Sequence, residues 1–125
     1  MAKRDDIEER LVEFACRVLD LCDQLPKTPA GCHISDQLMR SGSSPAANYG
    51  EVRGSESLKD FVHKLGLVSK ELQESRNWLR ILRKRRMASE IELNWLYQEC
   101  DELCRIIGAS KKTARENLKK KNAQS

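Results

Sequence analysis

The chain has 125 residues, only 5% of them aromatic, with six glycines and three prolines, and this length suits one domain rich in helix. No run reaches the ~18 apolar residues that a membrane-spanning helix needs. Acidic residues near the start argue against a signal peptide. We therefore expect a cytoplasmic protein.

Charge is unevenly distributed along the chain. Residues 1–75 carry 10 basic and 13 acidic side chains, whereas residues 76–125 carry 13 basic and 6 acidic ones, which gives the net charge of +4. The second part of the chain is therefore the part expected to meet an anionic partner, if any part does.

The first predicted helix covers residues 5–25. Its apolar residues alternate at spacings of four and three, which places them on one stripe of a helix. The stripe consists of Ile7, Leu11, Phe14, Val18, Leu21 and Leu25. Pro26 and Pro29 end this helix, because proline has no backbone N–H to donate.

The second predicted helix covers residues 30–52, and Thr28 is its start signal. The inward positions repeat at the same spacing: Ile34, Leu38, Ser41, Pro45, Asn48 and Val52. Small residues 41–47 allow a neighbouring helix to approach closely. Pro45 is expected to kink this helix or to split it in two.

The third predicted helix covers residues 58–86 and begins at Ser57, which forms a capping box with Asp60. Its apolar residues occupy more than one face, which suits a helix with several neighbours. The narrow stripe is Leu58, Phe61, Leu65, Val68, Leu72, Ser75, Leu79 and Leu82, and the face is widened by Val62, Trp78 and Ile81.

The fourth predicted helix begins at the capping box formed by Ser89 and Glu92. Its stripe is Leu93, Leu96, Cys100, Leu103, Ile107, Ser110 and Ala114. Lysines replace apolar residues further on, and residues 116–125 are expected to form a basic, frayed tail. Short connections make successive helices antiparallel, so the sequence predicts one all-α domain over residues 1–125, an up-down-up-down four-helix bundle.

Catalytic patterns are missing from the sequence. Glu71 and Glu74 have the spacing of a carboxylate pair, but no histidine follows to complete a di-iron motif, and an ion-paired helix face is the simpler interpretation. Cys32 and His33 are sequence neighbours that do not face each other on a helix. No glycine-rich phosphate loop occurs. We expect neither enzymatic activity nor a cofactor or small-molecule substrate.

The five cysteines do not indicate a disulfide framework, because their number is odd and no secretion signal precedes them. Cys100 and Cys104 lie four residues apart on one helical face, but two thiols do not make a closed zinc site. Free cysteines commonly act as small apolar core residues. We predict no metal site and leave the role of this pair open.

Two basic clusters are the main candidates for a binding surface. The first is at the end of the third helix: Arg80, Arg83, Lys84, Arg85 and Arg86. The second is near the end of the fourth: Lys111, Lys112 and Arg115, with Lys119, Lys120 and Lys121 beyond them. These cations complement the helix dipoles or bind a nucleic-acid backbone. In an antiparallel bundle they lie at opposite ends, as two separate basic caps.

A polar residue in the second helix is a further candidate. Asn48 occupies an inward position, where an asparagine can fix helix register and assembly state. We interpret it as part of a hydrogen-bonded structural network, and a ligand site is the alternative.

A larger set of residues carries a family resemblance. The set is Arg40-Ser41, Ala47-Asn48-Tyr49-Gly50-Glu51, Asp60-Phe61, Lys64-Leu65, Lys70-Glu71, Glu74 and Trp78-Leu79. In order and spacing the chain resembles the 23S rRNA-intervening-sequence proteins over residues 7–110, most specifically over residues 40–82. The basic clusters are not part of the motif.

The resemblance implies an antiparallel four-helix bundle that assembles as a ring-shaped homopentamer without catalytic activity. Similar pentameric bundles are nucleic-acid-binding accessory factors in diversity-generating retroelements. The resemblance assigns five positions of the family motif to this chain, and we expect a structural role for them: Asn48, Tyr49, Glu51, Lys64 and Glu71. An exposed apolar stripe on a monomer would be an interface between copies.

Two functional hypotheses follow. The first is a homo-oligomeric module, a pentamer of this chain, that binds RNA or DNA through the basic helix ends and contacts no membrane. The second is a structural or protein-interaction module without nucleic-acid binding.

Overall fold

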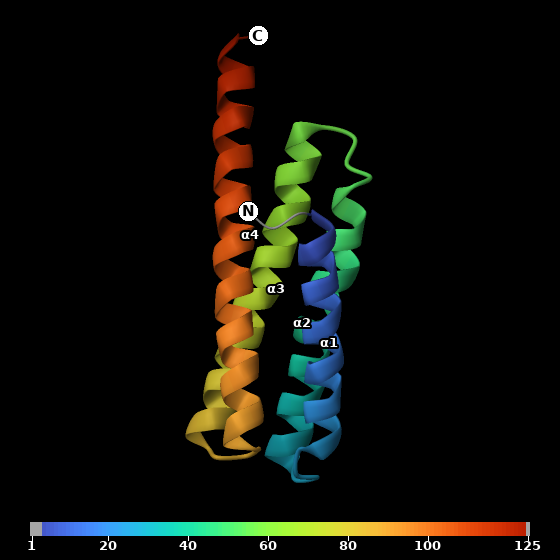
Figure 1. Cartoon of the computed structure of the whole chain (residues 1–125), viewed down its shortest axis with the longest axis vertical. Coiled ribbons are helices and arrows are strands. Elements are labelled where there is room, and N and C mark those ends of the chain that lie inside the picture. Colours follow the sequence, from blue (N-terminus) through green and yellow to red (C-terminus); the bar gives the residue numbers. More distant parts are fainter. Residues whose placement is uncertain (1–3, 125) are drawn as a thin grey trace.

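The computed structural model describes residues 4–124. Four helices follow one another in these residues: α1 (Arg4–Gln24), α2 (Pro29–Val52), α3 (Leu58–Lys84) and α4 (Glu90–Gln124). Each helix runs opposite to the one before it (Figure 1). α1 and α3 each pack against both α2 and α4. Of these four contacts between helices, the one between α1 and α4 is the smallest. The predicted all-α four-helix bundle is confirmed, with no strand in residues 4–124.

Side-chain caps explain where the helices begin. The hydroxyl of Thr28 accepts a hydrogen bond from the amide of Gly31 at 3.1 Å, and that of Ser57 accepts from the amide of Asp60 at 3.0 Å. Ser89 caps α4 in the same way at 3.5 Å. These bonds satisfy amides that have no partner inside the helix. The starts of α2, α3 and α4 were therefore readable in the sequence.

The end of α3 differs from the prediction. The helix stops at Lys84, not at Arg86, because Arg86 adopts a left-handed backbone with φ 52°. The amide of Met87 then donates to the carbonyl of Leu82 at 3.0 Å, which closes the helix end. Glycine is the usual residue at such a position, since a side chain there costs about 1–2 kcal/mol.

This geometry leads to a prediction about the turn between α3 and α4. Arg86→Gly is expected to raise the free energy of unfolding by about 0.5–1 kcal/mol, because it removes the strain without removing a described ion pair. Urea denaturation measures the change. Arg85→Gly is the control. Arg85 has an ordinary helical φ of −81°, so glycine relieves no strain there and should lower the free energy of unfolding. A loss of stability in Arg86→Gly would contradict the prediction.

The hydrophobic core follows the predicted stripes closely. All six positions of the first predicted stripe are buried, including Leu25 just after the end of α1, as are Leu93, Leu96, Cys100, Leu103 and Ile107 of α4. The prediction was wrong at Asn48, which is only half-buried. Tyr49 instead takes the inward position, with 8% of its surface exposed.

The small residues of α2 let it pack closely against α1. A Cβ on Gly42 would lie 2.7 Å from Cγ1 of Val18, which is closer than such atoms approach. The hydroxyls of Ser43 and Ser44 donate to backbone carbonyls one turn back, each at 2.6 Å. α2 continues through Pro45 and is not split there. The kink at Pro45 stays a prediction.

Two serines make a polar contact inside the core between α2 and α3. Ser41 and Ser75 are fully buried, and their hydroxyl oxygens lie 2.9 Å apart. The Ser75 oxygen is also 2.9 Å from the backbone carbonyl of Glu71. The pair of hydroxyls is thus satisfied without water, as buried polar groups require.

The last turns of α4 extend past the other three helices (Figure 1). α4 has 35 residues and α1 has 21, so α4 is longer by about 21 Å at 1.5 Å per residue. Residues from Glu116 on form helix in this structure, and their fraying stays a prediction. None of the four helices in residues 4–124 has the length and apolar character to cross a membrane. We call residues 109–124 the α4 arm.

Candidate functional site

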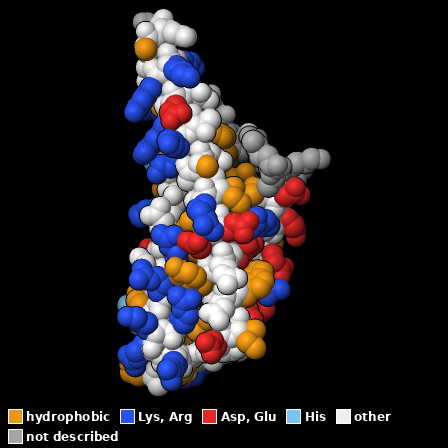
Figure 2. Space-filling model, turned by 60° about the vertical axis from the view of Figure 1, so that its left-hand side comes forward, with side chains coloured by type: hydrophobic (Ala, Val, Ile, Leu, Met, Phe, Trp, Pro, Cys, Tyr) orange, Lys and Arg blue, Asp and Glu red, His pale blue; other side chains and the backbone are white. Residues whose placement is uncertain are grey.

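The two basic clusters are exposed to solvent. Every member of the first cluster, at the end of α3, is exposed, as are Lys112 and Arg115 of the second, while Lys111 is half-buried. Figure 2 shows Lys and Arg side chains along one side of the molecule, from the tip of α4 to the opposite end. The clusters do lie at opposite ends, but other cations lie between them.

A stripe along α4 accounts for part of this continuity. Arg105, Lys112, Arg115 and Lys119 are spaced seven, three and four residues apart, which places them on one side of the helix. All four are exposed. The expectation of two separate caps is therefore corrected: the cations form a track on one side of the bundle, because α4 runs the whole length of the molecule.

Most cations of α1 and α2, by contrast, have carboxylate partners. Arg10 contacts Glu99, Arg17 contacts Glu13, and Arg40 contacts Glu71 and Glu74. Arg53, the residue after α2, contacts Glu8. The members of the two basic clusters form no ion pair with a residue in the part of the chain described. Positive charge without a neighbouring carboxylate is thus concentrated on the ends of α3 and α4.

One aromatic residue lies next to the first basic cluster. The guanidinium of Arg83 lies over the ring of Tyr97, 4.4 Å from its centre. A cation–π contact of this kind holds the side chain in place while the guanidinium edge stays free to donate hydrogen bonds. The sequence did not reveal this contact, because the two residues belong to different helices.

The motif residues join α2 to α3. The carboxylate of Glu71 accepts a hydrogen bond from Arg40 at 2.8 Å, and Glu74 binds the same guanidinium. The ammonium of Lys64 is 3.1 Å from the Asp60 carboxylate and 3.4 Å from the carbonyl of Glu51. The predicted ion-paired face of Glu71 and Glu74 is present.

Asn48 does not form the network that we predicted for it. Its side chain is half-buried and makes no hydrogen bond with any residue in the range 4–124. Asp60, in contrast, is well bound: the Lys64 ammonium and the amide of Glu56 hold the pKa of its carboxyl below the usual range. The ion pairs between α2 and α3 are therefore the organised part of the motif.

The cysteine pair lies between α3 and α4. The thiol of Cys100 is buried and donates to the carbonyl of Leu72 at 3.2 Å. The neighbouring thiol of Cys104 and burial raise the pKa of Cys100, whereas the neighbouring thiol of Cys100, aided by Arg76, lowers the pKa of Cys104. Cys104 is thus the thiol that ionises first. No group of three metal-binding side chains occurs in residues 4–124.

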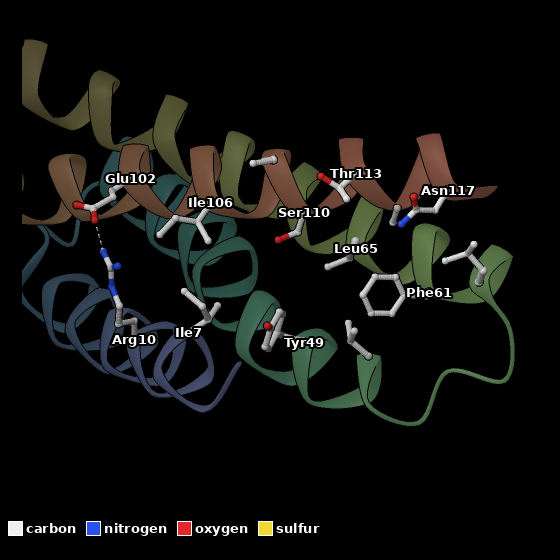
Figure 3. A pocket seen from close by; sticks show the side chains of 14 residues that line it. Ile7, Arg10, Tyr49, Phe61, Leu65, Glu102, Ile106, Ser110, Thr113 and Asn117 are labelled. Atoms are coloured by element: carbon white, nitrogen blue, oxygen red, sulfur yellow. Dashed lines mark ion pairs between the residues drawn. The ribbon is translucent and has the colours of Figure 1, made fainter. Parts of the chain in front are cut away.

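An apolar groove beside the α4 arm was missed by the sequence analysis. Its volume is about 770 Å³. Figure 3 shows side chains from all four helices around it. The apolar residues of its lining are Ile7, Tyr49, Val52, Leu58, Phe61, Leu65, Ile106, Ala109 and Ala114, and the remaining ones are Arg10, Glu102, Ser110, Thr113 and Asn117.

The groove explains a further difference from the prediction. Ser110 was placed on the buried stripe of α4, but it is exposed and lines the groove. The spacing gave its side of the helix correctly, since Ser110 faces the groove together with Ile7 and Tyr49, but the groove leaves it open to solvent.

Arg10 closes one end of this groove. Its guanidinium donates two hydrogen bonds to Glu99, at 2.6 and 3.1 Å, and lies 3.2 Å from Glu102 (Figure 3). The hydrogen bonds to Glu99 raise the pKa of Arg10 further, so the charge is permanent. These contacts tie α1 to α4, the two neighbouring helices that touch least.

Arg10→Ala is expected to lower the free energy of unfolding by about 1–2 kcal/mol, because it removes a two-pronged contact to a largely buried carboxylate. Arg105→Ala is the control: its ion pair with Asp101 is within one helix and its side chain is 73% exposed, so its effect should be below about 0.5 kcal/mol. Equal effects in the two variants, measured by urea denaturation, would contradict this.

Comparison with known proteins adds the family. A solved structure from Bacteroides thetaiotaomicron, a protein of unknown function from the S23 ribosomal protein family, has a TM-score of 0.78 and 26% sequence identity, and the match covers 85% of this chain and 98% of that one. A search of curated proteins finds no match. The family model of the 23S rRNA-intervening sequence protein matches residues 4–109. The chain therefore belongs to the 23S rRNA-intervening sequence protein family.

Proposed function

We propose that this protein is a non-enzymatic, self-associating module of the cytoplasm that binds a nucleic-acid backbone through the α3–α4 side of its bundle. The ligand is recognised by charge, so binding is independent of base sequence and sensitive to salt. Binding residues are the two basic clusters defined above, with Arg105 between them.

The observation that carries this proposal is the distribution of unpaired cations. The arginines of α1 and α2 named above, and Arg53 after α2, have carboxylate partners, whereas the cations of residues 80–86 and 111–121 have none among residues 4–124. Helix dipoles alone explain cations in a last turn, but Lys111 and Lys112 lie well before the end of α4. A row of exposed cations along a rod matches the repeating phosphates of a nucleic acid.

Self-association is supported by apolar residues on the outer face of α1. Val12, Cys16 and Leu19 are spaced four and three residues apart and are all exposed, Val12 and Leu19 by 42% and 39%. A second apolar stripe, opposite the core stripe, is typical of a helix that packs against another chain. The family resemblance implies a ring of five copies, and such a ring would multiply the basic track.

Two measurements on the purified protein test the proposal. Light scattering at micromolar concentration should give the mass of an oligomer. Binding to double-stranded DNA and RNA of mixed sequence should weaken as salt rises, with a linear dependence of log affinity on log salt concentration. A monomer, or an affinity that does not change with salt, would overturn the proposal. Oligomers that ignore both nucleic acids would favour a protein-interaction module.

A further inference from the structure

The end of the α4 arm is open to solvent on every side. From Arg115 to Gln124 each side chain is exposed except that of Leu118, which is half-buried. The last turns of α4 extend past the other three helices (Figure 1). Earlier in α4, by contrast, the side chains of Leu96 and Cys100 are fully buried in the bundle. A partner can therefore surround the end of the arm, whereas it can reach the rest of α4 only from the outer side.

Positive charge also surrounds this part of the helix. The arm carries six cations and one carboxylate, that of Glu116. Lys119, Lys120 and Lys121 follow one another, so they leave the helix in directions about 100° apart, and Lys121 lies on the side opposite Lys119. None of these three lysines forms an ion pair within residues 4–124. A flat anionic surface would need cations on one side only, whereas this arrangement suits a partner with negative charge on both sides of the helix.

The major groove of B-form DNA has such a charge distribution, because a phosphate backbone runs along each of its edges. The groove is about 12 Å wide and about 8.5 Å deep. An α-helix with its side chains is about 10–12 Å across, and residues 115–124 span about 15 Å at 1.5 Å per residue. The exposed end of the arm is therefore narrow enough to enter this groove and long enough to reach its floor.

The same helix does not fit a duplex of RNA. The major groove of an A-form duplex is deep and too narrow for protein side chains to enter, and its minor groove is wide and shallow. Lysines of the arm would meet the phosphates of such a duplex from the outside only. The shape of the arm thus selects DNA, although lysine contacts to phosphates select no base sequence.

The arm is also an addition to the family fold. The family match ends at residue 109, and the Bacteroides relative is covered almost completely while 15% of this chain is not. The relative has the same bundle without this part of the chain. The cations of the arm are therefore not needed to build the bundle.

We propose that the end of the α4 arm enters the major groove of duplex DNA, with Lys119 toward one phosphate backbone and Lys121 toward the other. This inference rests on the proposed function and narrows its ligand to B-form DNA. The first basic cluster lies at the opposite end of the bundle, so it adds phosphate contacts that do not depend on the groove.

Two duplexes of identical mixed sequence, one of DNA and one of RNA, test this inference. The wild type should bind the DNA duplex at least about tenfold more tightly than the RNA duplex at the same salt concentration. Joint replacement of Lys119, Lys120 and Lys121 with glutamine should remove most of this preference, because the affinity for DNA falls further than the affinity for RNA. Fluorescence anisotropy measures these affinities.

Arg83, Lys84 and Arg85 provide the matched control, because they are also three exposed cations but lie far from the arm. Their replacement with glutamine should weaken binding of both duplexes by a similar factor and leave the preference for DNA unchanged. Equal affinity of the wild type for the two duplexes, or a preference that the variant of the three lysines keeps, would overturn the inference and leave the proposed function standing. Failure to bind either duplex would overturn both.

Dimethyl sulfate identifies the groove directly, because guanine N7, which it methylates, lies in the major groove and adenine N3, which it also methylates, lies in the minor groove. Bound wild-type protein should lower the methylation of N7 and leave that of N3 unchanged. The variant of Lys119, Lys120 and Lys121 should protect neither atom. If the wild type protects N3 instead, or protects neither atom, the arm does not occupy the major groove and the inference is wrong.

Discussion

Replacement of the four basic residues 83–86 with alanine should weaken binding of a nucleic-acid duplex at least about tenfold at low salt. For each phosphate contact that is lost, one counterion fewer is released from the nucleic acid on binding. The slope of log affinity against log salt concentration then becomes shallower by about 0.9. Up to four such contacts per chain are lost, so the slope should fall by as much as about 3.6. Fluorescence anisotropy across a salt series measures both quantities.

A variant with other cations removed separates position from total charge. Lys27, Lys59 and Lys70 are exposed and belong to neither basic cluster. Their joint replacement with alanine lowers the net charge almost as much, but it should change the affinity by less than about threefold, because more distant charges are screened. If both variants lose affinity equally, the α3–α4 side is not the binding surface. If neither does, the protein-interaction hypothesis is favoured.

The sequence predicted the bundle well because spacing determines which side of a helix is apolar. Leu11, Phe14 and Val18 recur at three and four residues and are all fully buried. Spacing does not report where the packing of neighbouring helices leaves a gap, and so Ser110 was assigned to the core although it is exposed and lines the groove. The groove was missed for the same reason, since residues from all four helices line it.

The candidate site was only half visible in the sequence. The basic clusters stand out in composition, but their significance depends on which cations have carboxylate partners. Arg10 and Glu99 are 89 residues apart in the chain, and no local pattern pairs them. Asn48 shows the reverse problem: its position in the heptad predicted burial, yet the larger Tyr49 beside it takes the inward place, because more apolar surface is gained by burying a tyrosine ring.

Gly31→Ala is expected to lower the free energy of unfolding by about 3 kcal/mol or more. A Cβ on Gly31 would lie 1.9 Å from the backbone carbonyl oxygen of Pro26. That atom belongs to the loop between α1 and α2, so no side chain can rotate away, and either the loop or the first turn of α2 has to move. The same movement would disturb the hydrogen bond from the Gly31 amide to the Thr28 hydroxyl, which caps α2.

Two other glycines in helices make this prediction specific to the contact. Gly66 and Gly108 have no heavy atom within 4 Å of the place where a Cβ would stand. Their replacement with alanine should stabilise the fold by about 0.5–1 kcal/mol each, because alanine favours helix and restricts the unfolded chain. Urea denaturation of the three variants therefore has to give changes of opposite sign. A stable Gly31→Ala protein would mean that the loop after α1 adapts easily, and that the close junction between α1 and α2 does not fix the bundle.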